Sequence, residues 1–252
     1  MISSIEKRTA YILCSILLTL VTSCSTLPNG SKNWSENTLK KLSLREKIGQ
    51  MLIYRMNMRL KDISLSKWKE IVDLINSDGL GGIHLWYGEA SSSLTIMNKM
   101  QDMSKIPILF DADIEYGLHQ RFPKGTDLLP LMAIAATNNP NNAYDIGKII
   151  AKESRAVGIH WNFSPVVDVN NNPANPIINV RSFSEDPGMV IDYGIQFMKG
   201  LQDYGMLATA KHFPGHGDTE TDSHSSLAMI SSDSLRLWTL EIPPFRSMIN
   251  NG

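Results

Sequence analysis

A loop near the C-terminal end of the sequence gathers most of the side chains suited to catalysis. Residues 211–224 read KHFPGHGDTETDSH and hold three of the six histidines of the chain, with a lysine and three acids. A proline and two glycines in this stretch exclude a regular helix. Three interpretations compete: a solvated loop with incidental histidines, a metal site and an acid/base pair.

The metal interpretation depends on the spacing of His212 and His216. The two residues stand four positions apart, as zinc-binding histidines do on a helix. Pro214 and Gly215 lie between them and disrupt the helix that makes this spacing useful. The spacing alone therefore supports a metal only weakly.

The acid/base interpretation depends on Asp222 and His224. In an extended segment, residues two positions apart point the same way, so the carboxylate can accept the imidazole N–H. This contact fixes the ring tautomer and favours the charged ring, and histidine titrates near neutral pH. Such a pair can protonate a leaving group and afterwards deprotonate water.

The segments before and after this loop alternate between short apolar runs and amphipathic stretches. Helices are predicted over residues 39–47, 65–77, 92–103, 141–157 and 189–204. Strands are predicted over residues 48–56, 82–86, 106–110, 159–169 and 206–212. A last helix is predicted over residues 233–250, with an interruption at Pro243 and Pro244. Five serial β/α units predict a parallel sheet with helices outside it.

Polar residues follow three of these strands: Asp111 and Asp113, then Asp168, then Lys211 and His212. Five units fit an open doubly wound sheet or part of a barrel, and in both folds chemistry occurs at strand ends. The sequence has no glycine-rich nucleotide motif after the first strand and no Gly-Lys-Ser/Thr loop. We therefore predict an α/β fold of the (β/α)8 TIM-barrel type, incomplete, with about five of its eight units.

Residues 211–224, the candidate catalytic loop, resemble the signature of glycoside hydrolase family 3. The likeness is strongest to its bacterial β-N-acetylglucosaminidase branch, in which Lys-His-Phe-Pro-Gly-His-Gly-Asp-Thr precedes Asp-Ser-His. Other segments resemble the same family in the same order: residues 43–51, 81–83, 113–117 with Arg121, 162–175 and 181–187. The likeness covers residues 39–252, which we expect to form a partial barrel of this family.

The resemblance implies that His224 is the general acid/base and that Asp222 orients it. It also implies that five side chains hold the sugar beside the scissile bond: Asp113, Arg121, Arg181, Lys211 and His212. Carboxylates accept from sugar hydroxyls and cations donate to them, and a dense set of this kind rejects analogues that leave a member unpaired. The alternative for Arg181 and Asp113 is a structural ion pair across the barrel mouth.

Three aromatic side chains could stack on a sugar: Trp86, Trp161 and Phe183. Single aromatic residues more often belong to a hydrophobic core. We therefore leave these three outside the predicted site.

The implied reaction removes terminal β-linked N-acetylglucosamine from glycans such as peptidoglycan fragments. It is a retaining double displacement without metal or organic cofactor, and it requires a carboxylate nucleophile. In the family this nucleophile follows the seventh strand, whereas the sequence stops at Gly252, in the helix after the fifth. Nothing marks Asp111, Asp168 or Asp218 as a substitute. We therefore expect the nucleophile to be missing from this chain and the chain alone to be inactive.

Two other functions stay open. One is a family 3 β-glucosidase or xylosidase, although those branches resemble the Asp-Ser-His loop less closely. The other is a non-catalytic sugar-binding lipoprotein, which the missing nucleophile favours. A β-glucosidase or xylosidase would cleave a glycoside, whereas a sugar-binding lipoprotein would cleave none.

The first 23 residues are typical of a secretory signal, with two basic residues before an uncharged apolar run over residues 9–23. The run ends Val-Thr-Ser-Cys, which resembles a bacterial lipobox. We predict lipidation of Cys24, with residues 24–38 as the lipidated cysteine and its tether; a plain signal peptide is the alternative. Export and lipidation would attach the chain to a membrane facing the periplasm, and Ser25 gives no acidic retention signal, which favours the outer membrane.

Composition limits the partners. The 252 residues carry 24 Lys+Arg and 25 Asp+Glu, a net charge of -1, which gives no electrostatic reason to expect nucleic-acid binding. Hydrophobic residues make up 42%, as in globular proteins. Of the two cysteines, Cys14 would leave with the signal, so the mature chain would form no disulfide. The expected partners are a carbohydrate and, through the lipid anchor, a membrane.

Overall fold

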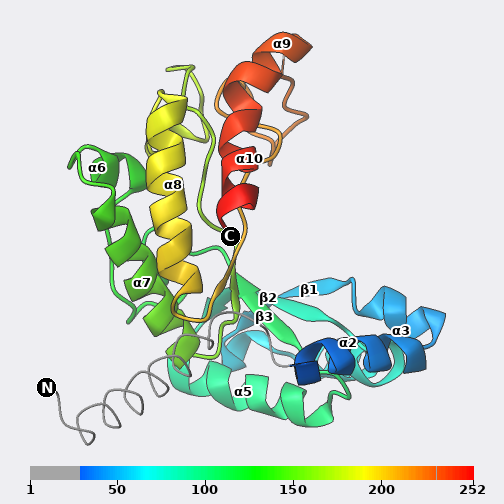
Figure 1. Cartoon of the computed structure of the whole chain (residues 1–252). Coiled ribbons are helices and arrows are strands. Elements are labelled where there is room, and N and C mark those ends of the chain that lie inside the picture. The colour runs from blue at the N-terminus through cyan, green and yellow to red at the C-terminus, as the bar shows by residue number, and fades with distance from the viewer. Residues whose placement is uncertain (1–28, 231) are drawn as a thin grey trace, which may run out of the picture. The chain divides into compact units, whose positions relative to one another are not determined.

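The computed structural model describes residues 29–230 and 232–252 (Figure 1). The predicted signal, Cys24 and the first part of the predicted tether lie outside the described residues. The chain divides into two compact units, Met1–Lys47 and Ile48–Gly252. None of the helices in the described part combines the length and apolarity that a membrane span requires.

Helix α2 (Asn29–Lys41) makes up most of the described part of the first unit. It begins inside the segment predicted as a tether, and also well before the helix predicted from residue 39. After Gly30 the segment contains neither proline nor glycine, and Lys40 and Lys41 complement the helix dipole in the last turn. The sequence is therefore compatible with a helix despite its polar composition.

The second unit contains one sheet of five parallel strands in the order β1-β2-β3-β4-β5. The strands are β1 (Ile53–Met58), β2 (Gly82–Gly88), β3 (Leu109–Ala112), β4 (Trp161–Asn162) and β5 (Leu207–Ala208). Each strand pairs with the next one along the chain. This order confirms the predicted serial β/α units and the α/β fold of a partial (β/α)8 barrel.

Two strands are much shorter than predicted. The strands expected over residues 159–169 and 206–212 keep only two ladder residues each, because Pro165 offers no N–H to a ladder. The two segments nevertheless stay side by side, since Thr209 N donates to the Ser164 carbonyl at 3.0 Å and Val167 N to the Lys211 carbonyl at 2.8 Å. This irregular pairing carries the chain from β4 and β5 into the loops of the site.

The helices follow the predicted order with several differences in their ends. They are α3 (Leu44–Gly49), α4 (Leu65–Asp73), α5 (Ala90–Met103), α6 (Leu131–Ala135), α7 (Asn141–Ala156), α8 (Pro187–Gln202), α9 (Ser234–Arg236) and α10 (Ile242–Asn251). Short 3-10 turns span Leu60–Asp62, Leu118–Gln120 and Asn179–Arg181, and π-helical turns span Leu74–Asp78 and Leu237–Glu241. Helix α6 was not predicted, and the strand predicted from residue 48 begins only at Ile53.

The last predicted helix is interrupted by a change of helix type. The π-helical turn Leu237–Glu241 separates α9 from α10, and Pro243 and Pro244 lie in the first turn of α10. The N–H groups of that turn have no partner within an α-helix, so prolines are tolerated there. The interruption therefore falls just before the two prolines.

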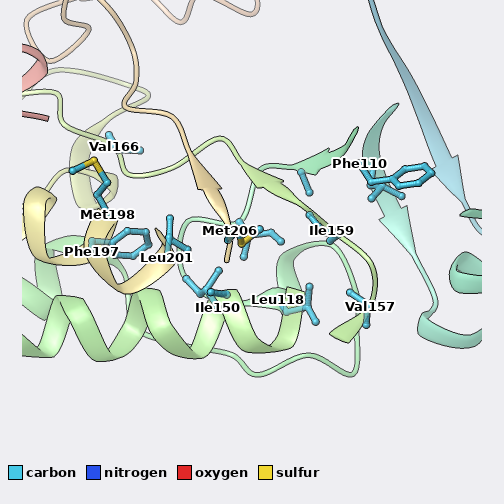
Figure 2. Close-up of a cluster of buried hydrophobic side chains, with 14 of the residues drawn as sticks. Phe110, Leu118, Ile150, Val157, Ile159, Val166, Phe197, Met198, Leu201 and Met206 are labelled. Carbon is cyan, nitrogen blue, oxygen red and sulfur yellow. The ribbon is translucent and has the colours of Figure 1, made fainter. Parts of the chain in front are cut away.

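The hydrophobic core lies between the sheet and its helices. Ile83 and Leu85 of β2 point to this side and are fully buried, as is Phe110 of β3. Figure 2 shows Phe110 in one cluster with side chains of α7 and α8, among them Ile150 and Leu201. Figure 1 shows α7 and α8 side by side.

The opposite face of the sheet carries a polar row. Successive residues of a strand point to opposite faces, so His84, between Ile83 and Leu85, points away from the helices. In the ladder Arg55 pairs with His84, His84 with Asp111, and Asp111 with Trp161. Four strands thus contribute one polar or aromatic residue each to the same level of this face.

Candidate active site

A cavity of about 730 Å³ lies at the carboxyl ends of the strands. Its lining includes every predicted catalytic and sugar-binding residue except Asp222: Asp113, Arg121, Arg181, Lys211, His212 and His224. Asp222 stands behind His224 and contacts it directly. Segments separated by about a hundred residues in the sequence therefore meet at one place.

The centre of the cavity is a cluster of two acidic and two basic side chains. Lys211 Nζ lies 2.8 Å from Asp113 Oδ1 and 2.7 Å from Glu115 Oε1. Arg181 donates to both oxygens of Glu115, from Nε at 2.9 Å and from Nη2 at 2.8 Å. The considered ion pair between Arg181 and Asp113 is therefore not the one that forms, because Glu115 is the partner of Arg181.

Glu115 was missed as a site residue. The sequence showed it within residues 113–117, but the resemblance assigned a role only to Asp113. Its side chain is 6% exposed, compared with 26% for Asp113. Burial raises the pKa of Glu115, but hydrogen bonds and charges from Arg181 and Lys211 outweigh this effect and lower the pKa to about 2. Glu115 is thus a fixed negative charge in the wall of the cavity.

Arg181 is the cation that pairs with Glu115 through two hydrogen bonds. Its burial lowers the pKa of the guanidinium, but the hydrogen bond and the charge of Glu115 raise the pKa above its usual value. Arg181 Nη1 also donates to the carbonyl of Ile177 at 3.0 Å. The side chain is therefore held in one position at the cavity wall.

Two tryptophans line the cavity, which corrects their assignment to the core. The guanidinium carbon of Arg121 lies over the ring of Trp86, 4.5 Å from the ring centroid. Trp161 Nε1 donates to Thr209 Oγ1 at 2.7 Å. Both tryptophans lie on the polar face of the sheet, because Trp86 stands two residues after His84 in β2 and Trp161 pairs with Asp111. Phe183 is buried against Phe197 and belongs to the core, as predicted.

Arg121 approaches Asp113 in two ways. Its Nε donates to the Asp113 carbonyl at 2.9 Å, and its Nη2 lies 3.7 Å from Asp113 Oδ2. Together with Lys211, Arg121 holds both the backbone and the carboxylate of Asp113. The predicted sugar-binding residues thus form one connected network.

Asp168, a second carboxylate that the prediction left without a role, anchors the catalytic loop. This fully buried side chain accepts from His212 Nδ1 at 2.6 Å and from the backbone N–H groups of His212 and His216. A Cβ on Gly217 would collide with the Val169 carbonyl, so only glycine permits this close approach. The peptide bonds preceding His212 and Pro214 are cis.

Asp222 and His224 are in contact, but the contact forms in a local turn and not in the extended segment that we predicted. Asp222 Oδ1 accepts from His224 Nδ1 at 2.7 Å and from His224 N at 2.9 Å. This is an Asx-type turn rather than an extended segment. The backbone and side-chain hydrogen bonds from His224 lower the pKa of Asp222. The His224 side chain is 77% exposed and keeps Nε2 available at the cavity rim.

The ring nitrogens of the other two loop histidines face protein groups. His212 Nδ1 lies 2.6 Å from Asp168 Oδ2, and His212 Nε2 lies 3.3 Å from Arg181 Nη2. His216 Nδ1 lies 2.5 Å from Thr219 Oγ1, and His216 Nε2 lies 3.0 Å from Ser223 Oγ. In the described part of the chain, no group of three potential ligands has a metal-binding arrangement. A metal at these histidines would have to displace the hydrogen bonds that shape the loop.

We expect Glu115→Gln to destabilise the fold at pH 7 by on the order of 3 kcal/mol, because it leaves Arg181 without its counter-charge and Lys211 with Asp113 alone. Since the folded pKa of about 2 lies below the ordinary 4.5, ionised Glu115 contributes fully above about pH 4.5. The contribution is lost as the pH falls towards 2. Urea unfolding across this range measures it, with Asp73→Asn in the exposed Lys69–Asp73 pair as the control. A pH-independent difference between the variant and the native chain would contradict the assignment.

Comparison with known proteins agrees with this geometry. Residues 43–252 match the glycosyl hydrolase family 3 N-terminal domain. A β-N-acetylglucosaminidase/β-glucosidase of Cellulomonas fimi is 32% identical over 206 residues, which are 81% of this chain and 35% of that protein. The structure of a family 3 β-N-acetylglucosaminidase from Paenibacillus sp. str. FPU-7 is similar with a TM-score of 0.75 and 36% identity, covering 84% of this chain and 40% of the other.

A β-glucoside phosphorylase is similar with a TM-score of 0.79 and 27% identity, over 90% of this chain and 40% of the other. The chain thus spans about a third of the length of the curated relatives it first matches, 35% of one and 32% of another. The match nevertheless extends over most of the chain and includes the whole catalytic loop. The chain therefore belongs to glycosyl hydrolase family 3 through its N-terminal domain.

Proposed function

We propose that this chain forms the sugar-binding and proton-transferring part of a retaining β-N-acetylhexosaminidase. Its substrates would be glycans with terminal β-linked N-acetylglucosamine, such as peptidoglycan fragments. One observation carries the proposal: a preorganised acid and base cluster lies in the same cavity as a histidine that an aspartate orients. The glycosidase names of the relatives support it.

The cluster is suited to binding a sugar. Asp113 is partly exposed to the cavity and can accept from hydroxyl groups, while Lys211 and Arg181 can donate to hydroxyl oxygens. Glu115 holds both cations in place before the ligand arrives, so little reorganisation is needed. Trp86 and Trp161 add aromatic surface for the apolar face of a sugar ring.

The proton would be carried by His224. Asp222 occupies Nδ1, which leaves Nε2 to protonate the departing oxygen and later to accept a proton from water. The exposed position of the ring at the cavity rim is compatible with proton transfer to a departing aglycone. This is the role that the resemblance implied.

The nucleophile has no candidate in the described cavity. The only carboxylates among its lining residues are Asp113 and Glu115, and both are engaged by cations. A retaining mechanism needs a second carboxylate that is free to attack the anomeric carbon. We therefore propose that the residues of this cavity bind the sugar but do not by themselves cleave it.

Binding of N-acetylglucosamine to the chain, measured by isothermal titration calorimetry, tests the sugar-binding role. Asp113→Asn should weaken binding by about tenfold or more, because a charge-assisted hydrogen bond to a hydroxyl is lost. Asp73→Asn, on the exposed surface of α4, should leave the affinity unchanged. Equal binding of glucose would favour the β-glucosidase alternative, and no binding of either sugar would contradict the proposal.

In any hydrolytically active form of the protein, His224→Ala should slow cleavage of glycosides with poor leaving groups by about 10²–10⁴-fold. Aryl glycosides with activated leaving groups should be affected far less in the first step, because their leaving groups depart as anions. Asp222→Asn should show a smaller version of this pattern, and Ser226→Ala none of it. Equal losses for both classes of substrate would argue for a structural role of the loop.

We also propose that Cys24 is lipidated and holds the protein on a membrane facing the periplasm. A combination of acyl chains makes such attachment stable. Cys24→Ala should move the protein out of the membrane fraction of expressing cells. Cys14→Ala is the matched control and should leave the fractionation unchanged. Membrane association that survives Cys24→Ala would disprove lipid anchoring at this residue.

A further inference from the structure

A buried histidine lies behind the sugar-binding cluster, between two carboxylates. His84 Nδ1 is 2.5 Å from Asp111 Oδ1, and His84 Nε2 is 3.5 Å from Asp113 Oδ2. The sheet register produces this arrangement, because His84 of β2 pairs with Asp111 of β3 and Asp113 follows two residues later on the same side. His84 thus connects the interior of the barrel to a residue that lines the cavity.

Asp111 depends on His84. Its side chain is fully buried, and its Oδ2 has no hydrogen-bond partner in the described part of the chain. Burial raises the pKa of Asp111, and the hydrogen bond and charge of His84 oppose this effect. A buried pair of this kind is weak evidence for stability, because well-packed apolar side chains often replace it without loss. Its presence beneath the cavity therefore needs another explanation.

The ring of His84 is held in a fixed plane. It stacks on Phe163 with the ring centroids 5.5 Å apart and an interplanar angle of 14°. Nδ1 makes the short contact with Asp111 Oδ1, while Nε2 faces Asp113 Oδ2 at 3.5 Å. The ring therefore lies between the two carboxylates, with one nitrogen towards each.

Asp113 is consequently held from three directions. Lys211 contacts Oδ1, while His84 and Arg121 face Oδ2 at 3.5 and 3.7 Å. These three groups come from β2, from the turn after β3 and from the end of β5. At 3.5 Å, His84 Nε2 contacts Asp113 Oδ2 without a short hydrogen bond, so both carboxylate oxygens of Asp113 can still accept from a ligand.

We propose that His84 is a positioning residue for sugar recognition, which fixes the carboxylate of Asp113 and is itself fixed by Asp111. This inference rests on the proposed sugar binding at Asp113. It assigns to the His84–Asp111 pair a role in substrate affinity rather than in the stability of the fold. Neither residue need touch the sugar.

The first arm of the test requires no sugar. Nitrogen-15 NMR of the histidine rings in the chain, with His84→Gln to assign the signals, should show that Asp113→Asn shifts Nε2 of His84. Asp111→Asn should shift Nδ1. If Asp113→Asn leaves the His84 signals unchanged, the two residues are not coupled and the inference is wrong, whether or not the chain binds sugar.

The second arm compares affinity with stability. His84→Leu combined with Asp111→Leu should leave the unfolding transition close to that of the native chain while weakening N-acetylglucosamine binding about tenfold. His84→Gln, which keeps one donor, should lose less affinity. His119→Gln breaks another His–Asp pair, His119–Asp127, outside the cavity lining, and should not change binding.

The outcomes separate the two proposals. Native affinity in the double variant would overturn the role of His84 while leaving the proposed function intact. A native chain that binds no sugar would overturn the proposed function and with it the recognition role of His84. A double variant that unfolds more easily but retains its affinity would identify the pair as purely structural and would also overturn the inference.

Discussion

The site depends on one buried carboxylate, that of Glu115. Its two oxygens bind a lysine at the end of β5 and an arginine in the turn before α8, so it joins three separate parts of the chain. Removing a carboxylate from water is costly, and only the hydrogen bonds from both cations offset the loss. The positions of Arg181 and Lys211, and through Lys211 that of Asp113, follow from this one charge.

Asp168 organises the start of this loop in a similar way, through the ring of His212 and the backbone N–H groups of His212 and His216. Its contacts with His212 and His216 fix the start of the loop, and Gly217 allows the loop to pass against Val169. Two buried acids therefore position nearly all the chemistry of the cavity.

Much of this could be predicted from the sequence. The order of the β/α units and the side chains that follow each strand were sufficient to locate the cavity. The role of Glu115 was not predictable, because a sequence shows an acid without showing which cation it meets. The two tryptophans were misassigned because their facing depends on strand register, and α2 was missed because polar composition was given more weight than the absence of breakers. The Asp222–His224 contact was predicted from extended geometry, whereas a local turn forms it.

The exposure of His224 has a consequence for how such a domain can diversify. The residues proposed to hold the sugar lie on strand ends and short turns beside the core, whereas His224, the proposed proton donor, lies on a surface loop that Asp168 and Asn175 hold at its start. Changes in that loop can alter the geometry of the departing group without repacking the barrel interior. The part of the cavity beside the core and the part on the surface loop can therefore vary separately.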